Sequence, residues 1–306
     1  MDGVDFQALA LEAIPKALVY AAVILALGTA AARQVFVRRV APGLPAVSSD
    51  PGDPGTPPAD AFQQSLARVA SLAAACLLAA LCLRAWGHTA VSFGFADSFS
   101  LENLTTVAWD SQWAEGWKLQ MAGAAALLIC TWATGPAAGA GWMLTAMAAT
   151  TMCGLLTLTG HASGEPPKML MHASHIFGAG LWLGTLMAMA VAARGAVRDA
   201  LLRAFAPYAF AGSVVLVVTG GLASLTYIGT LTNLVSTPYG WALLLKLVFV
   251  ADVATFGFLN WRRFHSTAAA SQRRPGNRDI FVVLEVVMAC MVILITAVLT
   301  ELEHPA

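Results

Sequence analysis

The chain has 306 residues, a formal net charge of zero, 58% hydrophobic residues and only 11% charged residues. Soluble domains carry roughly 25% charged residues, so this composition excludes an ordinary soluble domain and indicates an integral membrane protein. The zero net charge gives no argument for nucleic acid or an acidic substrate, and the five cysteines lie in apolar runs without a C-x-x-C pair, as buried hydrophobes do.

Apolar runs along the chain predict an all-α bundle that forms a single transmembrane domain over residues 1–306. The first run follows Asp2, Asp5 and Glu12 and precedes the arginines, which is the reverse of a cleavable signal peptide, so we expect it to be retained. A membrane-spanning helix needs about 20 residues, and eight runs are long enough. We predict spans at 15–37, 66–87, 117–134, 141–160, 168–193, 205–229, 239–262 and 279–300.

Arginines and lysines set the expected orientation of these spans. Twelve of the seventeen basic residues fall on one side of the predicted bundle, which the positive-inside rule makes cytoplasmic. Both termini and the loops 88–116, 161–167 and 230–238 then face the periplasm. The twelve are Arg33, Arg38, Arg39, Arg68, Arg194, Arg198, Arg203, Arg262, Arg263, Arg273, Arg274 and Arg278.

Two connections differ in composition. Residues 38–65 are rich in Pro, Gly, Ser and Asp and are predicted to form a disordered cytoplasmic linker. Residues 88–116 mix aromatic and acidic side chains, and we expect an ordered periplasmic loop that lies at the membrane interface.

The stretch from Gly160 to Leu186 is the main functional clue. It contains His161, His172 and His175, with Met169 and Met171 between them. His172 and His175 are three residues apart and share one face of a helix. Imidazole and thioether together suit copper better than calcium, magnesium or a structural zinc site, although zinc accepts the same imidazoles.

Other side chains are candidates for the same site. Cys153 and Lys246 fall at about the depth of His175, roughly 10 Å below the outer ends of their helices. His88, at the outer end of the second span, is a further candidate ligand. The alternatives are a solvated loop position for His161, hydrogen bonds between helices for His172 and His175, packing for Cys153, and an interfacial position beside Trp86 for His88.

Charged residues within the spans also need an explanation. Lys246, Asp252 and Glu285 lie inside apolar runs, where ionisable groups are costly and usually face the bundle interior. One hypothesis makes Asp252 and Glu285 a carboxylate pair on a translocation path that passes Lys246. The alternative is structural pairing between helices.

An ordered set of residues resembles the copper resistance D (CopD) family of bacterial inner-membrane proteins. The set begins with His161 and with His175 in the sequence HIFGAGLWLG, and it covers roughly residues 65–300. It continues through Phe205-Ala206-Pro207-Tyr208, Thr219-Gly220, Thr237-Pro238-Tyr239-Gly240, Leu243-Leu244-Leu245-Lys246, Asn260 and Glu285. His172, Met169 and Met171 are additions to the family pattern.

The resemblance implies a copper-handling protein of the bacterial inner membrane, involved in copper uptake or resistance. Such proteins often act with a small periplasmic copper-binding protein of the CopC type, which would be a separate chain here. We therefore expect copper, as Cu(I) or Cu(II), to bind at the periplasmic side and to pass inward.

Two other hypotheses stay open from the sequence. The helical histidine followed by Trp-x-Gly also resembles HemJ-type membrane oxidases of haem biosynthesis, which implies a redox protein binding haem b. The third hypothesis is a copper sensor or docking protein without transport. No Ser nucleophile elbow, H-E-x-x-H helix or P-loop occurs, so we do not expect an enzyme.

Overall fold

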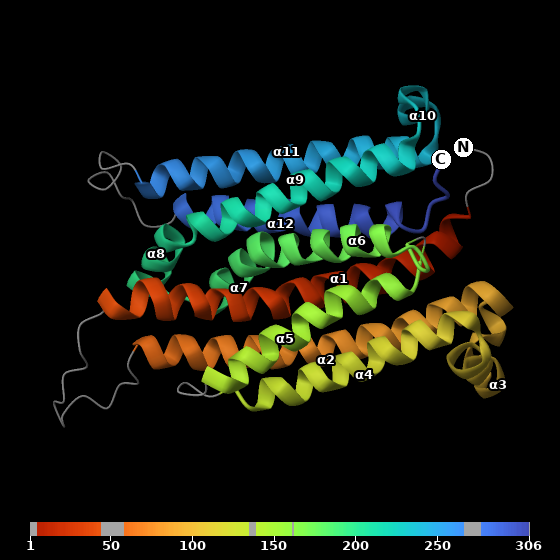
Figure 1. Cartoon of the computed structure of the whole chain (residues 1–306), viewed down its shortest axis with the longest axis horizontal. Coiled ribbons are helices and arrows are strands. Elements are labelled where there is room, and N and C mark those ends of the chain that lie inside the picture. The colour runs from red at the N-terminus through yellow and green to blue at the C-terminus, as the bar shows by residue number, and fades with distance from the viewer. Residues whose placement is uncertain (1–4, 44–57, 135–138, 161, 266–276, 306) are drawn as a thin grey trace.

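A computed structural model describes residues 5–43, 58–134, 139–160, 162–265 and 277–305. Within them, long helices run side by side along one axis (Figure 1). The long elements in chain order are α1 (Phe6–Val35), α2 (Pro58–Phe93), α4 (Gln112–Trp132), α5 (Gly139–Leu155), the rod of α6 (Pro166–Ala179), η6 (Gly180–Gly184) and α7 (Thr185–Ala192), then α9 (Ala206–Ile228), α11 (Pro238–His265) and α12 (Asn277–Leu299).

Helices that can cross a membrane account for most of the described chain. Six described segments are long and apolar enough: Phe6–Gly43, Ala59–Phe93, Gly139–Leu158, Pro166–Ala192, Ala206–Ile228 and Pro238–Leu259. They confirm the helical membrane character of the described chain, and each of the six candidate spans overlaps one of the eight predicted spans. The crossing of α4 and α12, whose described apolar part is Val283–Leu299, stays a prediction.

The two ends of the bundle differ in chemistry. The start of α1, the start of α6 and the end of α12 lie at one end, which we call the histidine end (Figure 1). The end of α1, the short helix α8 (Gly195–Ala204) and the end of α11 lie at the other, which we call the arginine end. This separation matches the predicted distribution of basic residues, whereas the assignment of the histidine end to the periplasm stays a prediction.

The two unusual connections contain helical structure. Residues 36–43 form the short helices η1 (Phe36–Val40) and η2 (Ala41–Gly43), and α2 begins at Pro58, so both edges of the expected linker 38–65 are helical. Residues 44–57 lie outside the described residues. The loop 88–116 contains the end of α2, η3 (Ala96–Phe99), α3 (Leu101–Thr105) and η4 (Thr106–Asp110).

Local signals fix several helix ends. The Asp5 carboxylate accepts hydrogen bonds from the backbone N–H groups of Gln7 and Ala8, which caps the start of α1. Ser111 caps α4 in the same way, and Thr230 caps the short helix α10 (Leu231–Ser236). Helix α9 ends at Gly229, whose φ of 67° is accessible to glycine with little strain.

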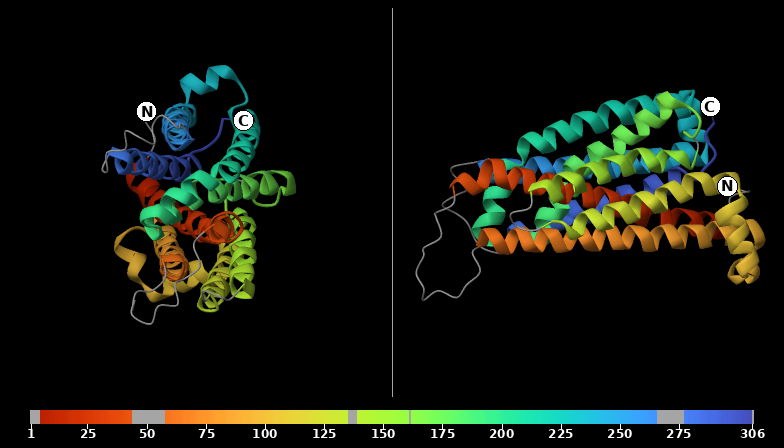
Figure 2. Two further views of the ribbon diagram at one scale, coloured as in Figure 1. Left: turned by 90° about the vertical axis from the view of Figure 1, so that its left-hand side faces the viewer. Right: turned by 60° about the horizontal axis from the view of Figure 1, so that its bottom comes forward.

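Helix α1 lies at the centre of the bundle, with α2, α5, the α6–η6–α7 rod and α12 around it (Figure 2). The rod approaches it most closely at η6, a π-helical turn. A Cβ placed on Gly184 would overlap the Ile24 carbonyl, and one placed on Gly28 would overlap Gly184. This glycine-to-glycine contact sets the position of α6, and so of His172 and His175, against the central helix.

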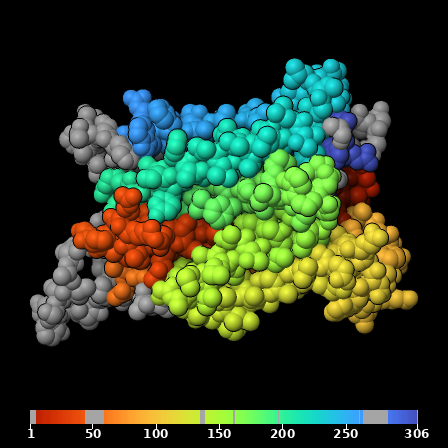
Figure 3. Space-filling model, viewed as in Figure 1, coloured from red at the N-terminus to blue at the C-terminus, as the bar shows by residue number. Residues whose placement is uncertain are grey.

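Helices α9 and α11 are the least covered spans. Only 11% of each apolar window is buried, against 44% for each of the other four spans. Figure 3 shows α9 and α11 on the outer surface of the bundle. Their outward faces are apolar, with Phe210, Val217, Leu225, Trp241 and Val248 exposed, as expected for contact with lipid.

Candidate metal-binding cavity

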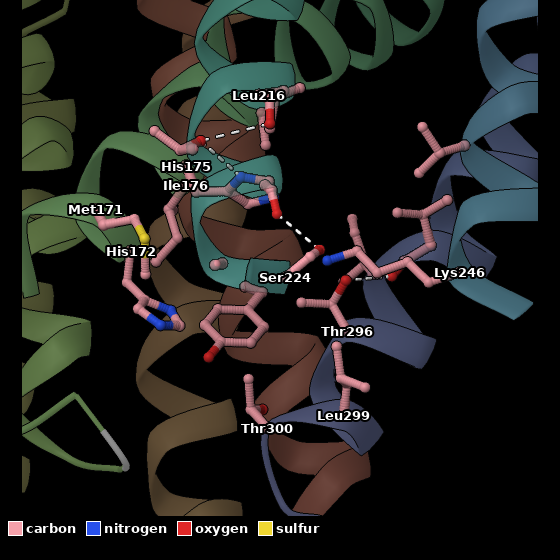
Figure 4. Close-up of a pocket in the computed structure, with 18 of the residues that line it drawn as sticks. Met171, His172, His175, Ile176, Leu216, Ser224, Lys246, Thr296, Leu299 and Thr300 are labelled. Atoms are coloured by element: carbon pink, nitrogen blue, oxygen red, sulfur yellow. Dashed lines mark hydrogen bonds between the residues drawn. The ribbon is translucent and has the colours of Figure 1, made fainter. Parts of the chain in front are cut away.

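A cavity of about 430 Å³ lies between α1, α6, α9, α11 and α12 toward the histidine end. Most of its lining surface is apolar, and polar side chains from several helices also line it (Figure 4). Such a cavity is the expected form of a small-ligand site in a helical bundle. The polar lining includes Lys16, His172, His175, Thr219, Ser224, Tyr227, Lys246, Thr296 and His304.

His175 is held by a hydroxyl on the neighbouring helix. Its Nδ1 lies 2.9 Å from Thr219 Oγ1, and the Thr219 hydroxyl donates to the Val215 carbonyl at 2.6 Å. Because that hydroxyl proton is already used, Thr219 accepts from the Nδ1–H of His175. This fixes the tautomer that leaves Nε2 unprotonated, which is the form in which imidazole binds a metal ion.

His172 lies nearer the histidine end, in an aromatic cluster. Its Nε2 is 3.0 Å from the Tyr227 hydroxyl, and the two rings meet edge-on with centroids 5.7 Å apart. The His304 ring lies on Tyr227 at a centroid distance of 5.1 Å. Two histidines and a tyrosine from α6, α9 and the C-terminal tail therefore gather at this end of the cavity.

Met171 also lines the cavity, so α6 presents sulfur and two imidazoles to one space (Figure 4). Of the described histidines, those that line it are His172, His175 and His304. The first two share one helix, and the third is on the tail. An axial pair on two facing helices, which the haem b hypothesis favours, gains no support from this arrangement.

Lys246 approaches the cavity from α11. The α11 residues that line the cavity form one stripe at three- and four-residue spacing: Tyr239, Leu243, Lys246, Leu247, Val250 and Val253. The Lys246 ammonium points inward beside Ser224 of α9, as Figure 4 shows. Lys246 therefore lines the same cavity as His172 and His175.

A second lysine is neutralised. Lys16 of α1 is 4% exposed, and its Nζ lies 2.6 Å from Glu301 Oε1 and 3.4 Å from the Thr300 carbonyl. The pair ties the central helix to the segment after α12. It forms part of the cavity wall at the histidine end.

Three predicted ligands lie outside this cavity. His88 is 2.7 Å from Glu12 Oε1 and stacks on Trp113, at the other side of α1. Met169 is half-buried but is not part of the lining. Cys153 is 2% exposed in the packed core formed by α1, α2, α4 and α5. His161 lies outside the described residues.

The surroundings of Cys153 predict a structural role. Its thiol donates to the Ala149 carbonyl at 3.4 Å, among aliphatic neighbours such as Met152 and Leu156. We expect Cys153→Ala to lower the free energy of unfolding by about 1 kcal/mol, because it removes a buried sulfur from a packed core. Copper binding by the purified variant should equal that of wild type. A weaker copper affinity would instead assign the thiol to the metal site.

The two membrane carboxylates are not brought together. Asp252 is exposed, and the helical period places it on the face of α11 opposite the cavity stripe. Glu285 is 3% exposed and lies beside Gly257 of α11, and the Trp182 ring also lies near that glycine. Neither side chain lines the cavity.

Some cavity residues carried little signal in the sequence. Lys16 lies near the start of the first apolar run, and His304 follows the last one. Their position in the same cavity as His172 could be recognised only from the structure, in which the start of α1, the start of α6 and the end of α12 lie at the same end of the bundle. Within the described residues, no three His, Cys, Asp or Glu side chains form a metal-binding group. Helix α6 offers two imidazoles and one thioether to a cavity whose surface is mostly apolar, which suits transient binding of a soft cation.

Comparison with protein families gives one match. Residues 199–299 match the family described as Copper resistance protein D. The matched part includes α9, α11 and α12 and hence Thr219, Tyr227 and Lys246, whereas α6 with His172 and His175 precedes it. No curated protein and no solved structure matches the chain.

Proposed function

We propose that this membrane protein carries copper across the bacterial inner membrane through the cavity at the histidine end, because residues 199–299 match the copper resistance protein D family. Copper, delivered from the periplasm, binds first near His172 and then at His175 Nε2, with Met171 as a sulfur donor. A separate periplasmic protein of the CopC type is the proposed donor.

The observation that carries this proposal is the hydrogen bond between His175 and Thr219. This hydrogen bond holds the His175 ring in one orientation and leaves the lone pair of Nε2 available to bind a metal ion. His175 lines a cavity whose other walls come from the family-matched helices α9, α11 and α12. Two observations therefore support the proposal: the orientation of the His175 ring, and the match of residues 199–299 to the copper resistance protein D family.

The inward route beyond the cavity is part of the proposal. Trp182 and Leu183 line the cavity on the side of η6, and both Glu285 and the Trp182 ring lie near Gly257 of α11. We place Glu285 on the path toward the arginine end, as a transient carboxylate ligand. Asp252 does not share this path, because it lies on the opposite face of α11.

Copper uptake by His175→Ala tests the proposal. Removal of the oriented imidazole should lower copper accumulation in cells, or copper flux into proteoliposomes, about tenfold or more, since even partners that only orient a ligand contribute 10–100-fold to metal affinity. Thr219→Val should lower it less, because the ligand remains and only its orientation is lost.

His88→Ala is the matched control. His88 is paired with Glu12 outside the cavity, so copper uptake should equal that of wild type when the two proteins are expressed at the same level. Unchanged uptake in a well-folded His175→Ala variant would contradict the proposal, as would a loss of uptake caused by His88→Ala alone.

A further inference from the structure

The charge of the cavity is unbalanced. Two lysines line it, and among the described lining residues there is no aspartate or glutamate. The Lys16 charge is cancelled by Glu301 at 2.6 Å. The structure gives the Lys246 side chain no hydrogen bond and no ion pair within the described part of the chain, so its ammonium form has no countercharge in the cavity.

Asp252 and Glu285, the two carboxylates predicted to lie on the translocation path, do not supply the missing charge inside the cavity. Asp252 is exposed on the opposite face of α11, and Glu285 lies beside Gly257 and is not part of the lining. The hydroxyls beside the ammonium are committed as donors: Ser224 donates to the Gly220 carbonyl and Thr296 to the Val292 carbonyl. Their oxygens are neutral acceptors and cancel no charge.

An isolated ammonium among apolar walls is costly, and a copper cation entering the same cavity would add a second positive charge. A bound anion removes both penalties. Apolar walls replace lost water poorly, so they favour an anion that is weakly hydrated and carries a single charge. The free volume of about 430 Å³ accommodates such an ion beside the histidines.

We propose that Lys246 forms the anion site of this cavity and binds a weakly hydrated monovalent anion, such as a halide or thiocyanate, next to the histidines of α6. The coupling to copper rests on the proposed function: the anion cancels the charge that would otherwise repel copper from His175. The anion site itself needs no copper and can be measured without it.

Thiocyanate is a suitable probe because it is a weakly hydrated monoanion with an infrared-active C≡N stretch. We expect titration of the purified full-length protein, in detergent and free of copper, to show a saturable, shifted band. Lys246→Met, which keeps the length of the side chain without its charge, should weaken this binding at least tenfold. Lys246→Arg should retain it, and bromide should compete where sulfate does not.

Lys118→Met is the matched control, since Lys118 pairs with Glu115 on α4 away from the cavity. His175→Ala should keep thiocyanate binding while it loses copper uptake, so the two proposals are tested separately. Absence of saturable binding to wild type, or equal binding to wild type and Lys246→Met, overturns the anion site and leaves the copper proposal to its own test. A Lys246→Met protein that does not fold is recognised by its thermal transition, and Lys246→Gln then takes its place.

Discussion

Gly184→Ala is expected to prevent normal packing of the bundle, although it adds a single methyl group. A Cβ at this position would overlap the backbone carbonyl of Ile24 on α1, and backbone cannot move aside as the end of a flexible side chain can. The α6–η6–α7 rod must then separate from α1 or change its register. Overpacking of a tight site typically costs about 1–3 kcal/mol and occasionally more, and contact with backbone belongs to the upper end of that range.

Gly154→Ala is the control for this prediction, because a Cβ on Gly154 of α5 meets no atom within 4 Å. There we expect unchanged or slightly higher stability, since alanine favours a helix by about 1 kcal/mol over glycine. The measurement is the unfolding transition of each variant in detergent, by heat or by titration with a denaturing detergent. Equal transitions for the two alanine variants would contradict the close contact between η6 and α1.

Hydropathy was sufficient to predict the long helices and their order along the chain. Apolar runs of about 20 residues predicted long helices in the right order because a helix in lipid must satisfy its own backbone, so its length is set by the membrane. The short helices α8 and α10 were not predicted, since Gly195–Ala204 and Leu231–Ser236 are too short for such a signal. The extension of α2 to Phe93 was also missed, because its last turn passes the end of the apolar run.

The site was only partly predictable. His172, His175 and Met171 were found because they are close in sequence on one helix, and Lys246 because a lysine in an apolar run is conspicuous. Equal depth was not enough for Cys153, because depth along a helix gives no information on which face a side chain occupies. Thr219, Tyr227 and His304 became recognisable only when α9 and the tail were placed beside α6.

The ion pair between Lys16 and Glu301 predicts an asymmetric response to mutation. Lys16 has a side chain that is 5% exposed, whereas the Glu301 side chain is 22% exposed. Glu301→Leu leaves a buried ammonium without its countercharge, whereas Lys16→Met leaves a carboxylate that can still reach water. We therefore expect Glu301→Leu to lower the free energy of unfolding by about 2–3 kcal/mol, and Lys16→Met by about 1 kcal/mol.

The double variant Lys16→Met/Glu301→Leu should regain most of this loss, because removing both partners leaves no unpaired charge in the wall of the cavity. Lys118→Met breaks an exposed pair of the same 2.6 Å length on α4 and should change stability by less than about 1 kcal/mol. Unfolding of the four variants in the same detergent measures the coupling. Additive losses in the double variant would show that the two side chains do not act as a pair. An additive result would also mean that Glu301 does not balance the charge of Lys16. Among the described lining residues, Lys16 and Lys246 would then both be cations without a countercharge.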